Sequence, residues 1–189
     1  AITAGYPAGL ILKGNIFDIE HDEELRIAFD FDGVIADDSS EQVYKESGLS
    51  AFIENEENLA NQPANIGPLH KLLKELSTLQ KEEIKYQSQN SDYKSRLRLS
   101  IVTARNAPAH KRVINSLRAW GIDTINEAFF LGGIEKRRVL EILNPHIFFD
   151  DQVTHLEKTA DSIASVHIPF GIANKKLDLA DQKTPTTAD

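Results

Sequence analysis

The sequence predicts an α/β fold, a doubly wound parallel sheet with a small, mostly helical insertion after its first strand. Short apolar segments rich in branched and aromatic residues recur at 25–29, 97–102, 128–131, 146–149 and 166–170. Helical patterns separate most of these segments, as in parallel strands joined by crossover helices. The interval from Asp32 to Ser95 is far longer than one crossover requires, so we expect it to hold the insertion.

Helices are expected at 108–120, 135–143 and 153–164, where apolar residues recur every three or four positions. Pro108 and Gly121 fit the start and the end of the first of them. Within the long interval, we expect helices at 41–46 and at 68–84, the second with a row of leucines on one face. A polar, irregular segment lies between these two helices, and 87–95 resembles a loop.

These expectations divide the chain into an α/β core and a cap. The core comprises 1–35 and 96–180, the mostly helical cap comprises 36–95, and 181–189 is expected to be a flexible tail.

Composition narrows the class of protein. Of the 189 residues, 41% are hydrophobic and 26% charged, which is typical of a globular chain. The net charge of −8 argues against a nucleic-acid or membrane partner, since both favour a basic surface. There is no cysteine, no apolar run long enough to span a membrane and no secretory signal pattern. We therefore expect a cytoplasmic protein, and a homo-oligomer is compatible with these features.

Polar residues cluster where the expected strands end. They are Asp30 and Asp32 after the first strand, Thr103, Ala104, Arg105 and Asn106 after the second, Lys136 beyond the third, and Asp150 and Asp151 after the fourth. In a doubly wound sheet, ligands bind beyond the carboxyl ends of the strands. We therefore expect these residues to form one site.

Phosphoryl transfer is the chemistry that uses such a set. A carboxylate can attack phosphorus and form an acyl phosphate, and Mg²⁺ would offset the charge of several carboxylates beside a phosphate. Asp30 and Asp32 share a face of extended chain, so Asp30 can be the nucleophile while Asp32 acts as general acid and base. Thr103 and Lys136 would hold the remaining phosphate oxygens.

Each motif also has a structural explanation when taken alone. An isolated Asp-x-Asp is common, Asp150 and Asp151 or Thr103 could cap a helix, and Lys136 could lie on a solvated helix face. The joint pattern favours catalysis, because each element falls at or just beyond a strand end in an order that one mechanism explains.

The same residues resemble the four motifs of the haloacid dehalogenase-like superfamily: DFDGV at 30–34, Thr103, Lys136 and the pair Asp150-Asp151. The resemblance implies a Rossmann-like core and an aspartyl-phosphate on Asp30. It also implies Mg²⁺ held by Asp30, the main-chain carbonyl of Asp32 and Asp151, with Asp150 in support.

A more specific resemblance spans Ile27 to Asn174. The stretches AFDFDGVIADDSSE, VTARNAPAHKRV, FFLGGIEKRRVL, FFDDQ and HIPFGIAN are similar to the cytosolic 5′-nucleotidase I family. This similarity implies hydrolysis of nucleoside 5′-monophosphates, AMP or IMP being typical, to nucleoside and phosphate. The residues just past Thr103, which are Ala104, Arg105 and Asn106, are then expected to contact the substrate together with Lys136.

Other functions stay open on these motifs. A dehalogenase is disfavoured because Asp32 is present, and a receiver domain because there the acidic pair precedes the phosphorylated aspartate. A phosphatase or phosphomutase acting on another ester, such as a sugar phosphate, and a non-catalytic nucleotide sensor remain as alternatives. Base contacts from the cap are hypothesised for Tyr44, Phe52 and Asn55, with Phe52 as readily a core residue.

Overall fold

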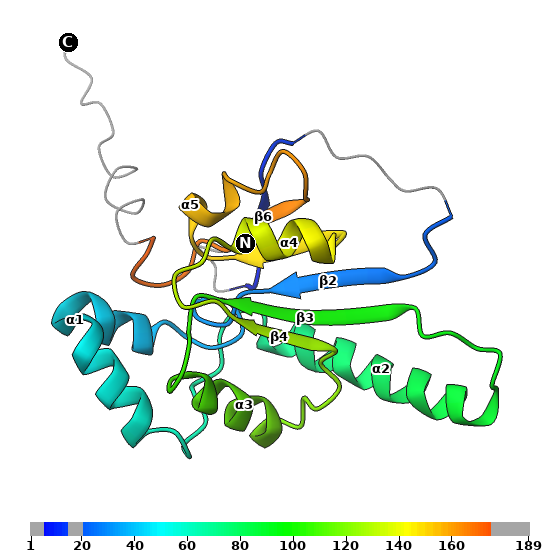
Figure 1. The fold of residues 1–189 in the computed structure, drawn as a ribbon, viewed down its shortest axis with the longest axis horizontal. Helices are drawn as coiled ribbons and strands as arrows, with labels where there is room; N and C mark the ends of the chain where they lie inside the picture. The colour runs from blue at the N-terminus through cyan, green and yellow to red at the C-terminus, as the bar shows by residue number, and fades with distance from the viewer. Residues whose placement is uncertain (1–5, 15–20, 175–189) are drawn as a thin grey trace, which may run out of the picture.

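The computed structural model describes residues 6–14 and 21–174, and this part of the chain forms one six-stranded sheet with helices on both faces (Figure 1). The strands are β1 (Leu10–Ile11), β2 (Leu25–Phe29), β3 (Leu97–Thr103), β4 (Glu127–Phe130), β5 (Ile147–Asp150) and β6 (Ser165–His167), arranged in the order β1-β6-β5-β2-β3-β4. All neighbours pair in parallel except β1 and β6, which are antiparallel. The predicted α/β class is confirmed, while β1 was not expected.

Helices cover the sheet from both sides (Figure 1). They are α2 (His70–Gln89) and α3 (His110–Ala119) on one face, and α4 (Lys136–Leu143) and α5 (Val153–Leu156) on the other. Successive residues of β2 point to opposite faces. Phe29 accordingly joins the apolar cluster of α2 and α3, whereas Ala28 joins that of α4 and α5. The two clusters make the sheet the centre of the core.

The connections of the sheet reverse direction beside β2. The chain runs from β2 to β3 and β4, and then returns to β5 on the other side of β2. Such a reversal opens a crevice beyond the carboxyl ends of the two strands, where ligands bind in folds of this kind. Asp30 directly follows β2, and Asp150 is the last residue of β5.

The long interval contains two helices with different surroundings. The first, α1 (Ser39–Asn58), is broken at Gly48 (φ 80°, ψ −177°) and lies beyond the carboxyl ends of the strands (Figure 1). The helix expected at 41–46 is its first part, and the second part was not expected. By contrast α2 packs on the sheet, with Leu73 in the same cluster as Ile27. The division into a core at 1–35 and 96–180 and a cap at 36–95 stays a prediction.

The helix expected at 153–164 is wrong in its length, because α5 ends at Leu156 and turns follow it. The hydroxyls of Thr159 and Ser162 donate to main-chain carbonyls there, with oxygen–oxygen distances of 3.0 Å to Leu156 and 3.3 Å to Thr159. Such side-chain bonds offer the backbone an alternative to the helix. The tail expected at 181–189 lies outside the described residues.

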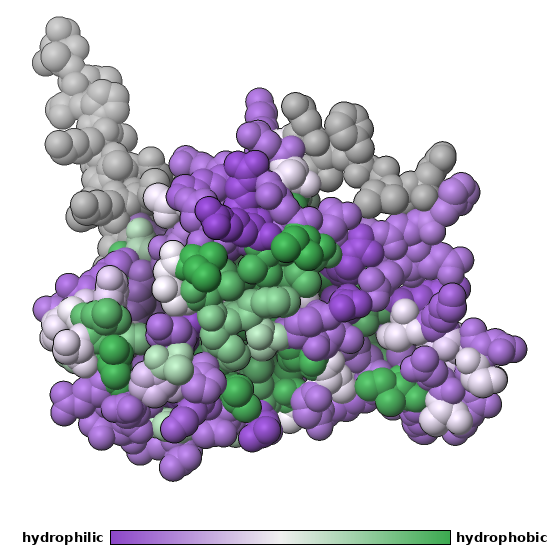
Figure 2. Space-filling view, viewed as in Figure 1, coloured by the Kyte–Doolittle hydropathy of each residue, from purple (hydrophilic) through white to green (hydrophobic). Residues whose placement is uncertain are grey.

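The surface over the edge strand β4 is largely apolar, and it forms a strip between α3 and α4 (Figure 2). Phe129 and Phe130 of this strand are half-buried. Within 6–14 and 21–174, no helix combines the length and the apolar character needed to cross a lipid bilayer.

Candidate active site

The turn after β2 and the acidic pair at the end of β5 lie against each other. The main-chain N–H of Asp30 donates to the carbonyl of Phe149 at 2.8 Å. Gly33 adopts φ +70°, and a Cβ at this position would lie 2.5 Å from the carboxyl group of Asp151. Only glycine both tolerates this backbone conformation and admits the carboxyl group so closely. The two acidic motifs expected to form one site therefore lie together.

Lys136 joins two of the aspartates. Its Nζ lies 2.7 Å from Oδ2 of Asp30 and 2.7 Å from Oδ2 of Asp150, and all three side chains are buried. Burial alone would lower the pKa of Lys136, but the two carboxylates outweigh it and raise that pKa. The lysine thus stays charged, and it offsets part of the negative charge around Asp30.

The other contacts of Asp150 satisfy its carboxylate. Oδ1 accepts the main-chain N–H of Gln152 at 2.8 Å, and Nδ1 of His155 lies 3.2 Å from Oδ2. Burial acts to raise the pKa of Asp150, and the charge of Lys136 together with the contact of His155 lowers it below its ordinary value.

The carboxylate of Asp151, unlike that of Asp150, is not satisfied by hydrogen bonds. Both of its carboxylate oxygens are buried, and neither has a hydrogen-bond partner among the residues that the structure describes. Burial, followed by the charges of Asp30 and Asp150, raises the pKa of Asp151 to about 9. Burial also raises the pKa of Asp30, to about 7, although Lys136 opposes this shift. A buried carboxylate without a partner is costly unless a cation compensates it.

These oxygens fit a divalent cation beside Asp30. Asp30, Asp150 and His155 also bring one ligand atom each within 4.8 Å of one another. That alternative group is already bridged by Lys136 and by the contact of His155 with Asp150. The unsatisfied oxygens of Asp151 therefore point to Asp151, with Asp30, as the better place for a cation.

Thr103 ends β3 at the same edge. Phe29 of β2 pairs with Ile101 of β3 in the parallel ladder. Asp30 and Thr103 lie just beyond this pair, so both are at the carboxyl ends of neighbouring strands. Thr103 is buried and its hydroxyl oxygen accepts the main-chain N–H of Arg105 at 3.3 Å, while Ala104 and Asn106 are exposed. Contacts of these residues with a phosphate stay predictions.

The guanidinium of Arg105 is engaged within the protein. Its Nε and Nη2 each donate to a different oxygen of Asp32 at 2.7 Å, and its Nη1 pairs with Glu56 of α1. A role of Arg105 in substrate binding stays a prediction. Sequence reasoning missed Glu56 and its second partner Arg112, because neither falls at a strand end and Glu56 lies in a stretch of exposed polar residues.

The hypothesised base contacts lie on α1. The rings of Tyr44 and Phe52 meet edge to face with centroids 6.2 Å apart, and Tyr44 is exposed. Nδ2 of Asn55 donates to Glu56 at 3.2 Å. All three thus lie on the helix beyond the strand ends, and their role stays a hypothesis.

Known proteins resemble the chain in sequence. A family model described as 5′-nucleotidase matches residues 1–175. Cytosolic 5′-nucleotidase 1B of Homo sapiens is 41% identical over 137 residues, which are 72% of this chain and 22% of that protein. The chain therefore spans less than a quarter of the length of this relative. No solved structure is significantly similar to the chain.

Proposed function

This chain belongs to the 5′-nucleotidase family, and on that premise we propose that it is a cytoplasmic phosphoric monoester hydrolase that converts nucleoside 5′-monophosphates to nucleoside and inorganic phosphate. One observation carries the proposal. Asp30 is buried against Lys136, and Asp151, which packs on Gly33 of the same turn, has two carboxylate oxygens without partners among the described residues. A carboxylate nucleophile, a fixed ammonium and a place for a cation are the groups that phosphoryl transfer requires.

We propose Mg²⁺ as the cofactor, held by Asp30, the main-chain carbonyl of Asp32 and Asp151, with Asp150 in support. Mg²⁺ prefers one or two carboxylates together with water and phosphate oxygens. The unpartnered oxygens of Asp151 supply such a carboxylate. When bound, the ion would polarise the phosphoryl group and offset the negative charge of the site.

In the first step an oxygen of Asp30 attacks phosphorus. Its carboxylate is held for attack because Oδ1 accepts the N–H of Phe31 at 2.7 Å and Oδ2 contacts Lys136. The bond between phosphorus and the ester oxygen O5′ breaks, and Asp32 gives its proton to that oxygen. The nucleoside leaves and an acyl phosphate remains on Asp30, with the charge of Lys136 beside it.

In the second step a water oxygen adds to phosphorus while Asp32 takes a proton from that water. The bond between Asp30 and phosphorus breaks, which restores the carboxylate and releases inorganic phosphate. Asp32 is thereby protonated again for the next substrate, so one residue performs both proton transfers.

The test is Asp30→Asn, with phosphate release measured over nucleoside monophosphates and sugar phosphates, with and without Mg²⁺. We expect the purified protein to prefer nucleotides, and the variant to lose about four orders of magnitude in kcat with its circular dichroism unchanged. Asp92→Asn, in an exposed loop, is the matched control and should keep full activity.

Three outcomes would contradict the proposal. Normal turnover by Asp30→Asn would show that Asp30 is not the nucleophile. Tight nucleotide binding without turnover favours a sensor, and sugar-phosphate isomerisation without net phosphate release favours a mutase.

A further inference from the structure

A buried ionic network surrounds Asp32, and it extends from the DFD turn to the inserted helix α1. Arg105 donates hydrogen bonds from Nε and Nη2 to the two carboxyl oxygens of Asp32, each at 2.7 Å. On its other side Arg105 pairs with Glu56, whose side chain is fully buried. Arg112 of α3 also donates to Glu56 at 2.8 Å, as does the hydroxyl of Ser40. Two carboxylates thus face two guanidinium groups.

The network holds Glu56 as an anion. Burial acts to raise the pKa of Glu56, but the charge of Arg105 and the Ser40 hydroxyl outweigh it and lower that pKa. The carboxylates of Asp32 and Glu56 likewise raise the pKa of Arg105 against the effect of burial. Glu56 and Arg105 therefore stay charged together, and each depends on the other for compensation.

Two aromatic rings fix the plane of the guanidinium. The Arg105 Cζ lies 5.3 Å from the ring centroid of Phe31 and 5.4 Å from that of Phe52. With the rings and Glu56 in place, Arg105 can present its planar fork to Asp32 in one orientation. The direction of the Asp32 carboxylate then depends on a residue of α1 that lies beyond the break at Gly48.

We propose that Glu56 is a positioning residue that acts through Arg105 to aim the carboxyl group of Asp32 at the leaving oxygen of the substrate. This inference rests on the proposed function, in which Asp32 protonates O5′. Small errors in the placement of a reacting group are costly in rate. The insertion thereby takes part in the chemistry as well as in covering the site.

The leaving group of the substrate distinguishes positioning from a structural role. A nucleoside 5′-oxygen needs a proton in order to leave, whereas the phenolate of p-nitrophenyl phosphate leaves without one. The quantity to measure is kcat/KM, because it depends only on the steps up to and including the transfer of the phosphoryl group to Asp30. For Glu56→Gln we expect kcat/KM to fall about tenfold to a hundredfold with the nucleotide, and less than about threefold with p-nitrophenyl phosphate.

Two control variants make the result specific. Arg112→Gln removes the other guanidinium from Glu56 and leaves Arg105 on Asp32. The thermal midpoint of this variant should fall as that of Glu56→Gln does. The ratio of its kcat/KM with the nucleotide to its kcat/KM with p-nitrophenyl phosphate should stay unchanged. Asp32→Asn should show the same selectivity as Glu56→Gln, but with a nucleotide loss of about a hundredfold or more. If Glu56→Gln does not fold, Arg105→Lys, which cannot make the bidentate contact, tests the same claim.

The outcomes separate this inference from the proposed function. The positioning role is overturned if Glu56→Gln, or Arg105→Lys when that variant replaces it, loses kcat/KM equally with both esters. It is also overturned if Arg112→Gln shows an equally selective loss of kcat/KM. If Asp32→Asn itself fails to discriminate between the esters, the acid role of Asp32 in the proposed function is at fault instead.

Discussion

At the carboxyl ends of β2 and β5, two aspartates share one ammonium group beside a third aspartate, whereas at the opposite end of the sheet one carboxylate is surrounded by donors. Asp30 and Asp150 contact Lys136, and Asp151 has no hydrogen-bond partner among the described residues. At the other end Glu83 of α2 accepts the main-chain N–H groups of Arg96 and Leu97 at 2.9 and 3.2 Å.

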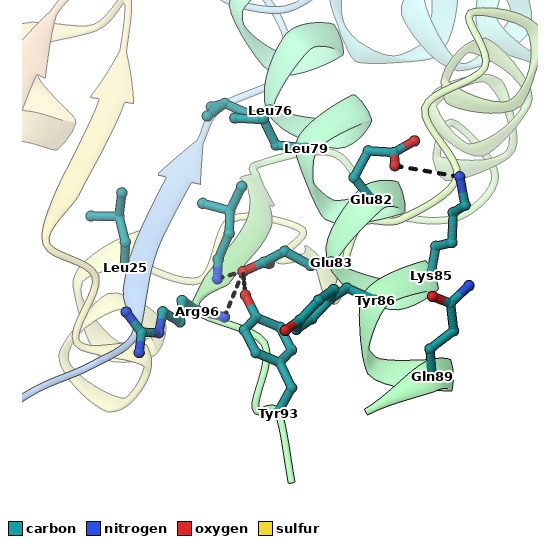
Figure 3. A pocket seen from close by; sticks show the side chains of 11 residues that line it. Leu25, Leu76, Leu79, Glu82, Glu83, Lys85, Tyr86, Gln89, Tyr93 and Arg96 are labelled. Carbon is teal, nitrogen blue, oxygen red and sulfur yellow. Dashed lines mark hydrogen bonds and ion pairs between the residues drawn. The ribbon is translucent and has the colours of Figure 1, made fainter. Parts of the chain in front are cut away.

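The Glu83 end also contains a large pocket, of about 630 Å³ (Figure 3). Its walls are mostly apolar and aromatic, with Leu25, Leu79 and Tyr86 among them. Glu83 accepts the hydroxyl of Tyr93 there at 2.8 Å (Figure 3). Burial acts to raise the pKa of Glu83, but these donors outweigh it and lower that pKa.

The two ends differ in how well their buried acidic groups are compensated. The pocket presents an acidic group that is already satisfied, so nothing there demands a charged ligand. The crevice at the carboxyl ends instead holds three buried aspartates beside Lys136, and burial raises the pKa of Asp30 and of Asp151. Natural proteins break such rules of compensation chiefly at functional sites.

The largest effect should come from removing the one ammonium at the crevice. Lys136→Met leaves Asp30 and Asp150 buried beside each other without a counter-charge, so we expect the free energy of unfolding to fall by about 3–5 kcal/mol. Urea titration followed by circular dichroism measures this loss. Lys158→Met is the control, because Lys158 pairs with Glu135 in the solvent at 2.7 Å, and exposed pairs contribute about 1 kcal/mol or less. Similar losses in the two variants would show that the crevice is compensated in some other way.

Asp150 and Asp151 are neighbours, but their replacement should change the free energy of unfolding in opposite directions. Asp151→Asn removes a carboxyl group whose pKa burial raises to about 9, so folding no longer has to protonate it or bury its charge, and the magnesium-free protein should gain about 1–3 kcal/mol. Asp150→Asn should instead lower stability, because Lys136 and the N–H of Gln152 lose a charged partner. Thermal unfolding in a metal chelator measures both changes.

Magnesium sharpens the same test. At a hundredfold excess over its Kd, an ion that binds the folded state adds about 2.7 kcal/mol to stability. We expect this increment in the unaltered protein and little or none in Asp151→Asn. If magnesium stabilises both proteins equally, Asp151 does not hold the ion.

Much of the crevice could be predicted because it depends on one rule of topology. Parallel strands bring their carboxyl ends to the same edge, so residues that follow strands meet whatever lies between them in sequence. The structure places Lys136 in contact with both Asp30 and Asp150, in agreement with that rule. The strands themselves were recognisable from their short apolar segments.

The network around Asp32 could not be predicted in the same way. Glu56 is 49 residues from Arg105 and 56 residues from Arg112, and no periodic pattern connects them. Its burial depends on how α1 turns at Gly48 and packs beside α3, which is a matter of tertiary structure. In sequence, Glu56 is one of several acidic residues on a polar stretch whose neighbours Glu54 and Glu57 are exposed.

The smallest expected effect tests the Glu83 end. Glu83→Gln keeps the shape of the side chain but weakens the bonds from Arg96, Leu97 and Tyr93. Hydrogen bonds to a charged group would suggest a larger cost, but the group is largely solvated, so we expect about 1 kcal/mol at neutral pH after discounting for screening. Phosphate release should be unchanged, because the pocket lies at the other end of the sheet.

The pH dependence of this loss has a definite sign. Because folding lowers the pKa of Glu83, its contribution is present above the pKa of an unfolded glutamate, about 4.3, and disappears as the pH falls through the lower folded value. Urea titrations of the two proteins should therefore differ at pH 7 and converge once the pH lies below the lowered pKa of the folded state. A difference that persists in acid would mean that Glu83 stabilises this end by packing, and the contrast in compensation between the two ends would no longer hold.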